Sequence, residues 1–134
     1  MLRDPARRRG GLAITFGDLK QLVAHLPEVT ESTSYGTPSL KVRGKSFCRM
    51  WGDSDFDRND VHHTEVLVVF CDLDEKPHLL AMDRKALFST PHYDGHGAVL
   101  VRLNRVERST LAGYLEESYL LKAPPSLRRA LGED

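Results

Sequence analysis

The sequence predicts a single domain of mixed helices and strands, on three observations. The chain has 134 residues, the size of one ordinary domain that can bury a hydrophobic core without disulfides or metals. Apolar residues recur at helical spacing within residues 15–26, 76–88 and 107–122. Residues 40–51 alternate instead with the period of two that is typical of paired strands.

Residues 1–14 are expected to form a flexible basic tail, because arginine, proline and glycine dominate them. Such a tail is either a solvated leader or an arm that seeks nucleic acid. The folded domain is then expected over residues 15–134.

The first helix is expected to begin at Thr15, whose hydroxyl can cap it together with Asp18 three residues later. Pro27 stops this helix. Its core-facing stripe consists of Leu19, Leu22, Val23 and Leu26.

A polar link then leads to residues 40–51, which predict a β-hairpin that turns at Gly44 and Lys45. One face of the hairpin carries Leu40, Val42, Cys48 and Met50. The opposite face carries Lys41, Arg43, Phe47, Arg49 and Trp51. We therefore expect a basic and aromatic outer face.

The second half predicts strands and helices in alternation after a polar excursion at residues 52–64. The apolar runs 66–71 and 98–103 are expected to be strands, and the first of them looks central in its sheet. Helices are expected at 76–88 and 107–122, followed by a short helix after Pro124 and Pro125 that holds Leu127 and Leu131.

The charge and cysteine content limit the possible partners and compartments. Nineteen Lys and Arg balance nineteen Asp and Glu, so the chain has no overall attraction to nucleic acid or to an anionic membrane, and such binding requires a local patch. Cys48 and Cys71 lie in apolar runs without metal or redox spacing, which indicates buried thiols in a reducing compartment. With no stretch long enough to span a membrane, a cytoplasmic protein is expected.

Metal sites and catalysis have little support in the sequence. Asp53–Asp60 begins like a calcium loop, but Arg58 stands where that loop needs glycine and Thr64 where it needs glutamate. His62, His63, His92 and His96 have no spacing that favours zinc over a surface location, and His25 and His78 look structural. Without a nucleophile motif or a phosphate-binding loop we expect a protein that is not an enzyme and that uses no cofactor.

Several of the quoted segments, taken in order, resemble the MmcQ/YjbR family of small bacterial proteins. The resemblance covers roughly residues 15–131. It rests on Leu26-Pro-Glu-Val29, Leu40 to Phe47, Val66 to Cys71, Thr90-Pro-His-Tyr93, Ala98 to Leu103, and Leu115-Glu-Glu-Ser-Tyr119 followed by Ala123-Pro.

The resemblance implies an α+β fold, with an antiparallel β-sheet packed against helices in the order α-β-β-β-α-β-β-α, similar to secretion-chaperone-like domains. It also implies DNA binding through a double-wing surface. The hairpin from Lys41 to Arg49 would be one wing, and the segment around His92, Tyr93 and Arg102 would contribute to the other. The acidic connection at residues 52–64 departs from this picture, because its charge opposes phosphate binding.

Two functional hypotheses follow, and both are non-catalytic. In the first, the protein binds double-stranded DNA, with phosphate contacts from Lys41, Arg43, Lys45, Arg49 and Arg102. In the second, it binds a protein or a small molecule in an aromatic-lined groove formed by Tyr35, Phe47, Trp51, His92 and Tyr93. The outer face of the hairpin is equally consistent with an ordinary solvated strand surface.

Overall fold

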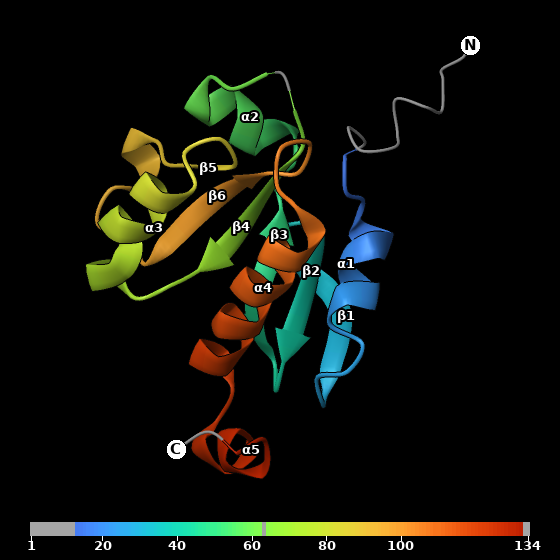
Figure 1. The fold of residues 1–134 in the computed structure, drawn as a ribbon. Helices are drawn as coiled ribbons and strands as arrows, with labels where there is room; N and C mark the ends of the chain where they lie inside the picture. The colour runs from blue at the N-terminus through green and yellow to red at the C-terminus, as the bar shows by residue number, and fades with distance from the viewer. Residues whose placement is uncertain (1–12, 63, 133–134) are drawn as a thin grey trace.

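A six-stranded sheet forms the centre of the protein in a computed structural model, which describes residues 13–62 and 64–132. The strands lie in the order β1-β2-β3-β4-β6-β5 (Figure 1). Every neighbouring pair is antiparallel, which confirms the α+β class. The strands are β1 (Val29–Ser34), β2 (Thr37–Val42), β3 (Lys45–Met50), β4 (Val66–Phe70), β5 (Leu87–Phe88) and β6 (Ala98–Arg102).

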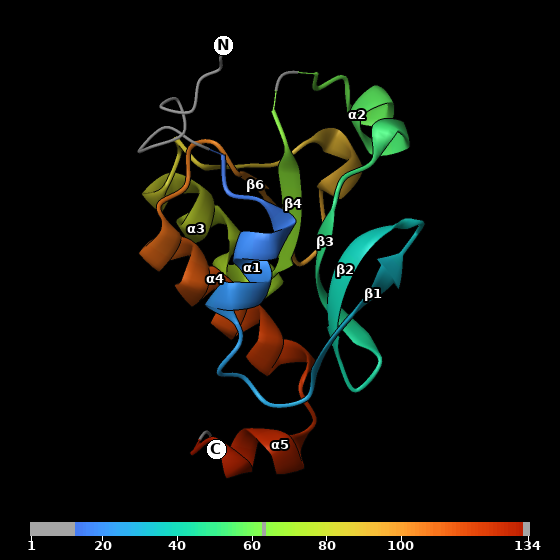
Figure 2. The ribbon, with the colours of Figure 1, turned by 90° about the vertical axis from the view of Figure 1, so that its right-hand side faces the viewer.

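The helices are distributed unequally over the two faces of the sheet. They are α1 (Phe16–Leu22), α2 (Asp53–Asn59), α3 (Lys76–Met82), α4 (Arg108–Lys122) and α5 (Pro125–Ala130), with short 3₁₀ helices η2 (Leu73–Glu75) and η3 (Pro91–Tyr93). Figure 2 shows α1, α3 and α4 together on one side of the sheet and α2 at one end of the other side. The second face is therefore only partly covered by helix.

Alternation along the strands divides the core into two clusters. Leu67, Val69, Val99 and Val101 point toward the face that carries α1 and α4 and join the larger cluster. Their chain neighbours Val66, Val68, Ala98 and Leu100 point the other way and pack with Trp51 and Tyr93. The continuous apolar runs 66–71 and 98–103 therefore belong to central strands that are buried on both faces.

The first helix begins as the sequence predicts, but the folded part begins before Thr15. Thr15 accepts a hydrogen bond from the Asp18 N–H at 3.1 Å, and Asp18 accepts one from the Thr15 N–H at 2.8 Å. Ile14 is only 6% exposed and donates its N–H to the Leu103 carbonyl at 3.0 Å. The tail predicted over residues 1–14 thus extends too far at its C-terminal end. Residues 1–12 lie outside the described part.

The predicted hairpin is present, but its turn consists of Arg43 and Gly44. Both have positive φ, 50° and 82°, as the two-residue turn that best fits strand twist requires. Lys45, expected in the turn, instead opens β3 opposite Val42. A similar turn at Tyr35 and Gly36, with φ of 53° and 79°, joins β2 to β1, a strand that the sequence does not predict because its residues are polar and mostly exposed.

A β-bulge changes which face Phe47 occupies. Leu40 pairs with Cys48 and Lys41 pairs with Ser46, so Phe47 is an extra residue on β3. Phe47 therefore joins the same buried cluster as its neighbour Cys48. The strict alternation assumed for the hairpin fails at this point.

The region after Trp51 also differs from the expectation in two places. Residues 53–59 form α2, where Asp55 accepts a hydrogen bond from the Gly52 N–H at 2.9 Å. The helix expected over 76–88 ends at Met82, and Leu87 and Phe88 form β5 against β6. That pairing depends on a strand more than ten residues away, so local periodicity does not reveal it.

Helix α4 follows the prediction and packs across the centre of the sheet. It buries Leu111, Leu115, Ser118 and Tyr119. The Ser118 hydroxyl accepts the Phe70 N–H at 3.0 Å and donates to the Phe47 carbonyl, so it links β4 to the bulge in β3. Within residues 13–62 and 64–132, no helix is long and apolar enough to cross a membrane.

Candidate binding cleft

A cleft of about 840 Å³ opens on the face of the sheet that α2 covers only in part. Its floor is formed by Val68 and Phe70 of β4 and by Ala98 of β6. Helix α2 forms one wall, the segment from η3 to β6 forms another, and the Tyr35 turn with the end of β3 forms a third. Lys122, the last residue of α4, also lines the cleft.

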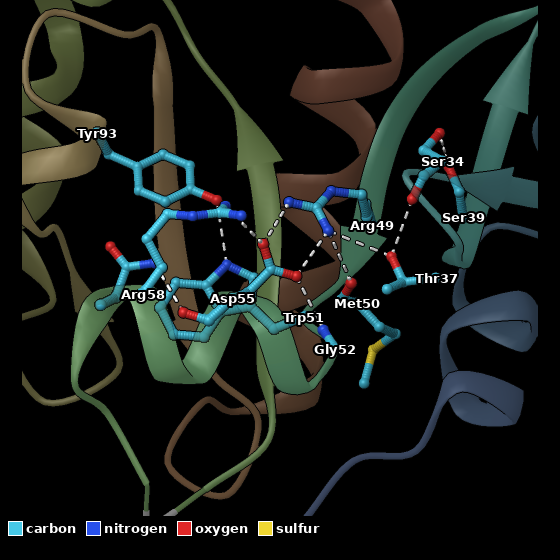
Figure 3. A network of polar contacts seen from close by, with 11 residues as sticks. Ser34, Thr37, Ser39, Arg49, Met50, Trp51, Gly52, Asp55, Arg58 and Tyr93 are labelled. Atoms are coloured by element: carbon cyan, nitrogen blue, oxygen red, sulfur yellow. Dashed lines mark hydrogen bonds and ion pairs between the residues drawn. The ribbon is translucent and has the colours of Figure 1, made fainter.

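An ion pair between Arg49 and Asp55 joins two of these walls (Figure 3). The guanidinium donates to both carboxylate oxygens, at 3.0 and 3.2 Å. The two side chains are only 12% and 10% exposed. Although burial would raise the pKa of Asp55, the Arg49 and Gly52 hydrogen bonds hold it below its usual value.

Arg49 also holds the Tyr35 turn in place. It donates to the Thr37 hydroxyl at 3.2 Å, and its guanidinium carbon lies 5.3 Å from the centre of the Tyr35 ring. One buried arginine thus connects β3, α2 and the β1–β2 turn. We interpret Arg49 and Asp55 as the structural frame of the cleft.

The wall near η3 rests on the only tryptophan of the chain. Trp51 is 4% exposed and donates its indole N–H to the Tyr93 hydroxyl at 3.1 Å. The two rings stack with centres 6.3 Å apart, and Phe56 of α2 packs edge-on against the indole. Tyr93 reaches the cleft directly, whereas Trp51 supports it from below.

A buried lysine fixes the loop that carries His92 and His96. The Lys76 ammonium donates to the carbonyls of Tyr93 and His96 at 2.7 and 3.0 Å. Lys76 is 6% exposed, and burial lowers the pKa of its amino group. His92 and His96 themselves are exposed at the edge of the cleft.

Four of the ten residues singled out from the sequence come together in this cleft: Tyr35, Arg49, His92 and Tyr93. Phe47 does not, because it is fully buried against Tyr119 with ring centres 5.5 Å apart. The prediction that Phe47 is available for stacking or groove contacts is therefore wrong. Trp51, also predicted as a groove residue, is buried behind Tyr93.

The predicted phosphate-contact residues do not form one surface. Arg49 and Lys45 lie at opposite ends of β3, and the charge of Arg49 is neutralised by Asp55. Arg43 pairs with Glu28 in an exposed ion pair. Arg102 lies on β6, where it donates to the Lys85 carbonyl at 3.1 Å and covers the Phe88 ring.

The segment that begins like a calcium loop in the sequence forms helix α2 instead, so its carboxylates have the spacing of a helix. Among the residues that the structure describes, no three His, Cys, Asp or Glu side chains gather as metal ligands would. His63, considered for zinc, lies outside the described residues. Cys48 and Cys71 are free thiols, and burial raises the pKa of Cys48 to about 12.

The family model called YjbR matches residues 24–121. The chain belongs to the YjbR family. The matched segment contains every residue that lines the cleft except Lys122. The cleft is therefore built almost entirely from the part of the chain that defines family membership.

Comparison with solved structures and curated proteins agrees with this assignment. The crystal structure of Deinococcus radiodurans protein DR2400, a DUF419 domain, has a TM-score of 0.63 and 22% identity, and the match covers 95% of this chain and 93% of that one. This similarity shows a common fold. The uncharacterized proteins Rv2570 of Mycobacterium tuberculosis and Mb2600 of Mycobacterium bovis are 42% identical over 52 residues, 39% of this chain and 40% of their own length. The aligned segment thus spans about two fifths of those relatives.

Sequence reasoning missed four charged residues of the cleft in this YjbR-family protein: Asp55, Arg58, Asp72 and Lys122. Asp55 and Arg58 lie in the polar excursion at residues 52–64, although Gly52 followed three residues later by Asp55 has the spacing of a helix start. Nothing local marks Lys122, because its place in the cleft depends on where α4 ends relative to Phe70.

Proposed function

We propose that this protein is a non-catalytic binding module whose ligand, a small molecule, occupies the cleft between α2, η3 and the Tyr35 turn. The observation that carries the proposal is a cleft of about 840 Å³ whose floor includes the buried side chains of Val68 and Ala98 and the half-buried ring of Phe70. A concave site with an apolar floor and a few polar groups is typical of small-molecule binding.

A binding role without catalysis is favoured by the polar groups of the cleft. Arg49 and Asp55 are occupied with each other. Among the described residues, neither His92 nor His96 makes a side-chain hydrogen bond to a nucleophilic group. A general base normally stands within hydrogen-bond reach of the group it activates.

Filling the cleft should weaken ligand binding without unfolding the protein. Ser54 is exposed on α2 and lines the cleft, so Ser54→Phe should weaken binding of the neutral probe N-phenylnaphthylamine by at least about tenfold. The readout is Trp51 fluorescence, because Tyr93 links this single tryptophan to the cleft. Stability should change by no more than about 0.5 kcal/mol.

The matched control is Asp57→Phe, on the exposed part of α2 that does not line the cleft. It should retain wild-type probe affinity. Equal affinity in wild type and Ser54→Phe, or no probe binding by the wild type, would count against a ligand in the cleft.

A second candidate function is binding of double-stranded DNA by the Arg43–Gly44 end of the β2–β3 hairpin. Its support is that no carboxylate among the described residues lies within ion-pair distance of Lys41 or Lys45, so both ammonium groups can contact phosphates. We place it second because Arg43 and Arg49 already have carboxylate partners and the whole chain is electrically neutral.

Fluorescence anisotropy of a labelled duplex at several salt concentrations tests this second candidate. The variant Lys41→Ala/Arg43→Ala/Lys45→Ala should abolish binding at moderate salt and reduce the slope of log affinity against log salt by roughly 0.9 for each phosphate that the protein no longer neutralises. Lys20→Ala/Arg128→Ala/Arg129→Ala, which removes the same charge elsewhere, should retain binding. If the two triple variants bind alike, the hairpin is not the DNA-binding surface.

A further inference from the structure

We propose that the cleft selects small organic anions that carry a flat apolar body, and that Arg58 and Lys122 contact the anionic group. This proposal rests on the proposed function of the same cleft and names the chemical class of its ligand. Nothing in the sequence alone marks either residue as a binding residue.

The cleft has a net positive charge when the Arg49–Asp55 ion pair is left out. Arg49 and Asp55 neutralise each other. Asp55 also accepts the Gly52 N–H at 2.9 Å, so its lone pairs are well occupied. Arg58 and Lys122 then face the single remaining carboxylate of the lining, Asp72, and the cleft has an excess of positive charge.

Arg58 has donors to spare. Its guanidinium forms a long ion pair with Asp55, 3.8 Å from one carboxylate oxygen, which is beyond hydrogen-bond length. The side chain is 52% exposed and projects from α2 toward Tyr93 (Figure 3). Because this long ion pair includes no hydrogen bond, the guanidinium can turn its N–H groups to a carboxylate, sulfonate or phosphate.

Lys122 brings positive charge directly to the apolar floor. Its ammonium lies 4.1 Å from the centre of the Phe70 ring, within the range of a cation–π contact. Among the described residues it has no carboxylate within ion-pair distance. A ligand that binds in the cleft next to Phe70 would thus place its charged end beside Lys122.

Tyr35 supplies an independent indication that the ligand has a flat apolar body. It is 94% exposed and adds nothing to either core cluster. Its φ of 53° lies in a region that large side chains rarely adopt. An exposed ring in a strained turn at the edge of a cleft is well placed to cover a bound ring.

Two probes that differ only in charge can test the proposal. Anilinonaphthalene sulfonate is N-phenylnaphthylamine with a sulfonate added, and energy transfer from Trp51 reports binding of both. Arg58→Gln/Lys122→Gln should weaken the sulfonate probe by about tenfold or more and leave the neutral probe within about twofold. Lys20→Gln/Lys45→Gln, with the same charge change outside the cleft, should leave both affinities near wild type.

The outcomes separate this proposal from the one on which it rests. If the cleft variant binds both probes like wild type, or if the control variant loses the sulfonate probe equally, the assignment of an anion site is wrong and the cleft remains a binding site. If Ser54→Phe leaves sulfonate binding unchanged, the anion binds elsewhere and the proposal is also wrong. If neither probe binds the wild type, both proposals fail together.

Discussion

Replacing Arg49 with methionine is expected to lower the free energy of unfolding by about 3–5 kcal/mol, because it leaves the Asp55 carboxylate buried without its partner. Asp55 is 10% exposed as a side chain and receives two of its hydrogen bonds from Arg49. The loss extends to the Tyr35 turn, since Arg49 also donates to Thr37. Urea denaturation near neutral pH measures the effect.

The double variant Arg49→Met/Asp55→Asn provides the control for this prediction. It removes the orphaned charge, so it should be more stable than Arg49→Met alone. If the single variant at Arg49 loses less than about 1 kcal/mol, the pair behaves like an exposed surface ion pair. In that case Arg49 does not frame the cleft.

The loss of folding stability at acid pH also depends on the Arg49–Asp55 pair. The folded-state pKa of Asp55 is lowered from an unfolded value of about 3.9. Its contribution to stability is therefore fully present above about pH 4 and is lost as the pH falls through the folded-state pKa. Asp55→Asn should remove that part of the acid-induced loss, which unfolding curves measured at about pH 6 and about pH 3 would detect.

Phe47→Ala is expected to destabilise the protein by about 3–5 kcal/mol, the usual cost of truncating a fully buried phenylalanine. Phe47 is 0% exposed and packs edge-on against Tyr119 beneath α4. Tyr35→Ala offers the matched aromatic truncation at a fully accessible position, with an expected change within about 0.5 kcal/mol. Chemical denaturation of both variants compares them directly.

This comparison also decides between two interpretations of the hairpin. A stacking residue on a DNA-binding wing would lose binding and keep stability when truncated. A core residue loses stability. If the Phe47→Ala protein were as stable as wild type, the result would contradict the buried position of Phe47. It would instead favour a position on the exposed face of the hairpin.

Features that depend on local chemistry were predictable from the sequence. The capping pair of Thr15 and Asp18 and helix α4 are where the sequence places them. Both signals lie within a few residues of the structure they specify, so neighbouring side chains alone determine them. The strands β4 and β6 were predictable for the same reason, since long apolar runs require burial on both faces.

Features that depend on pairing between distant segments were not predictable. The bulge that buries Phe47 requires the register between β2 and β3, and β5 exists because it pairs with β6. A shift of one residue exchanges the two faces of a strand. For this reason Phe47 is absent from the predicted basic and aromatic face of the hairpin.

The sequence by itself determined the class of the fold, most of its helices and strands, and four of the residues that meet in the cleft. Only the tertiary structure decided that Arg49 is neutralised by Asp55, that Arg58 forms only a long ion pair with the same carboxylate, and that Lys122 has no carboxylate within ion-pair distance among the described residues. The physical reason is that the effect of a charge depends on its partner and on its access to water. The neighbours of Arg49 and Lys122 in the cleft come from other elements. For these two residues, the partner of the charge and its access to water are therefore both set by how distant elements pack.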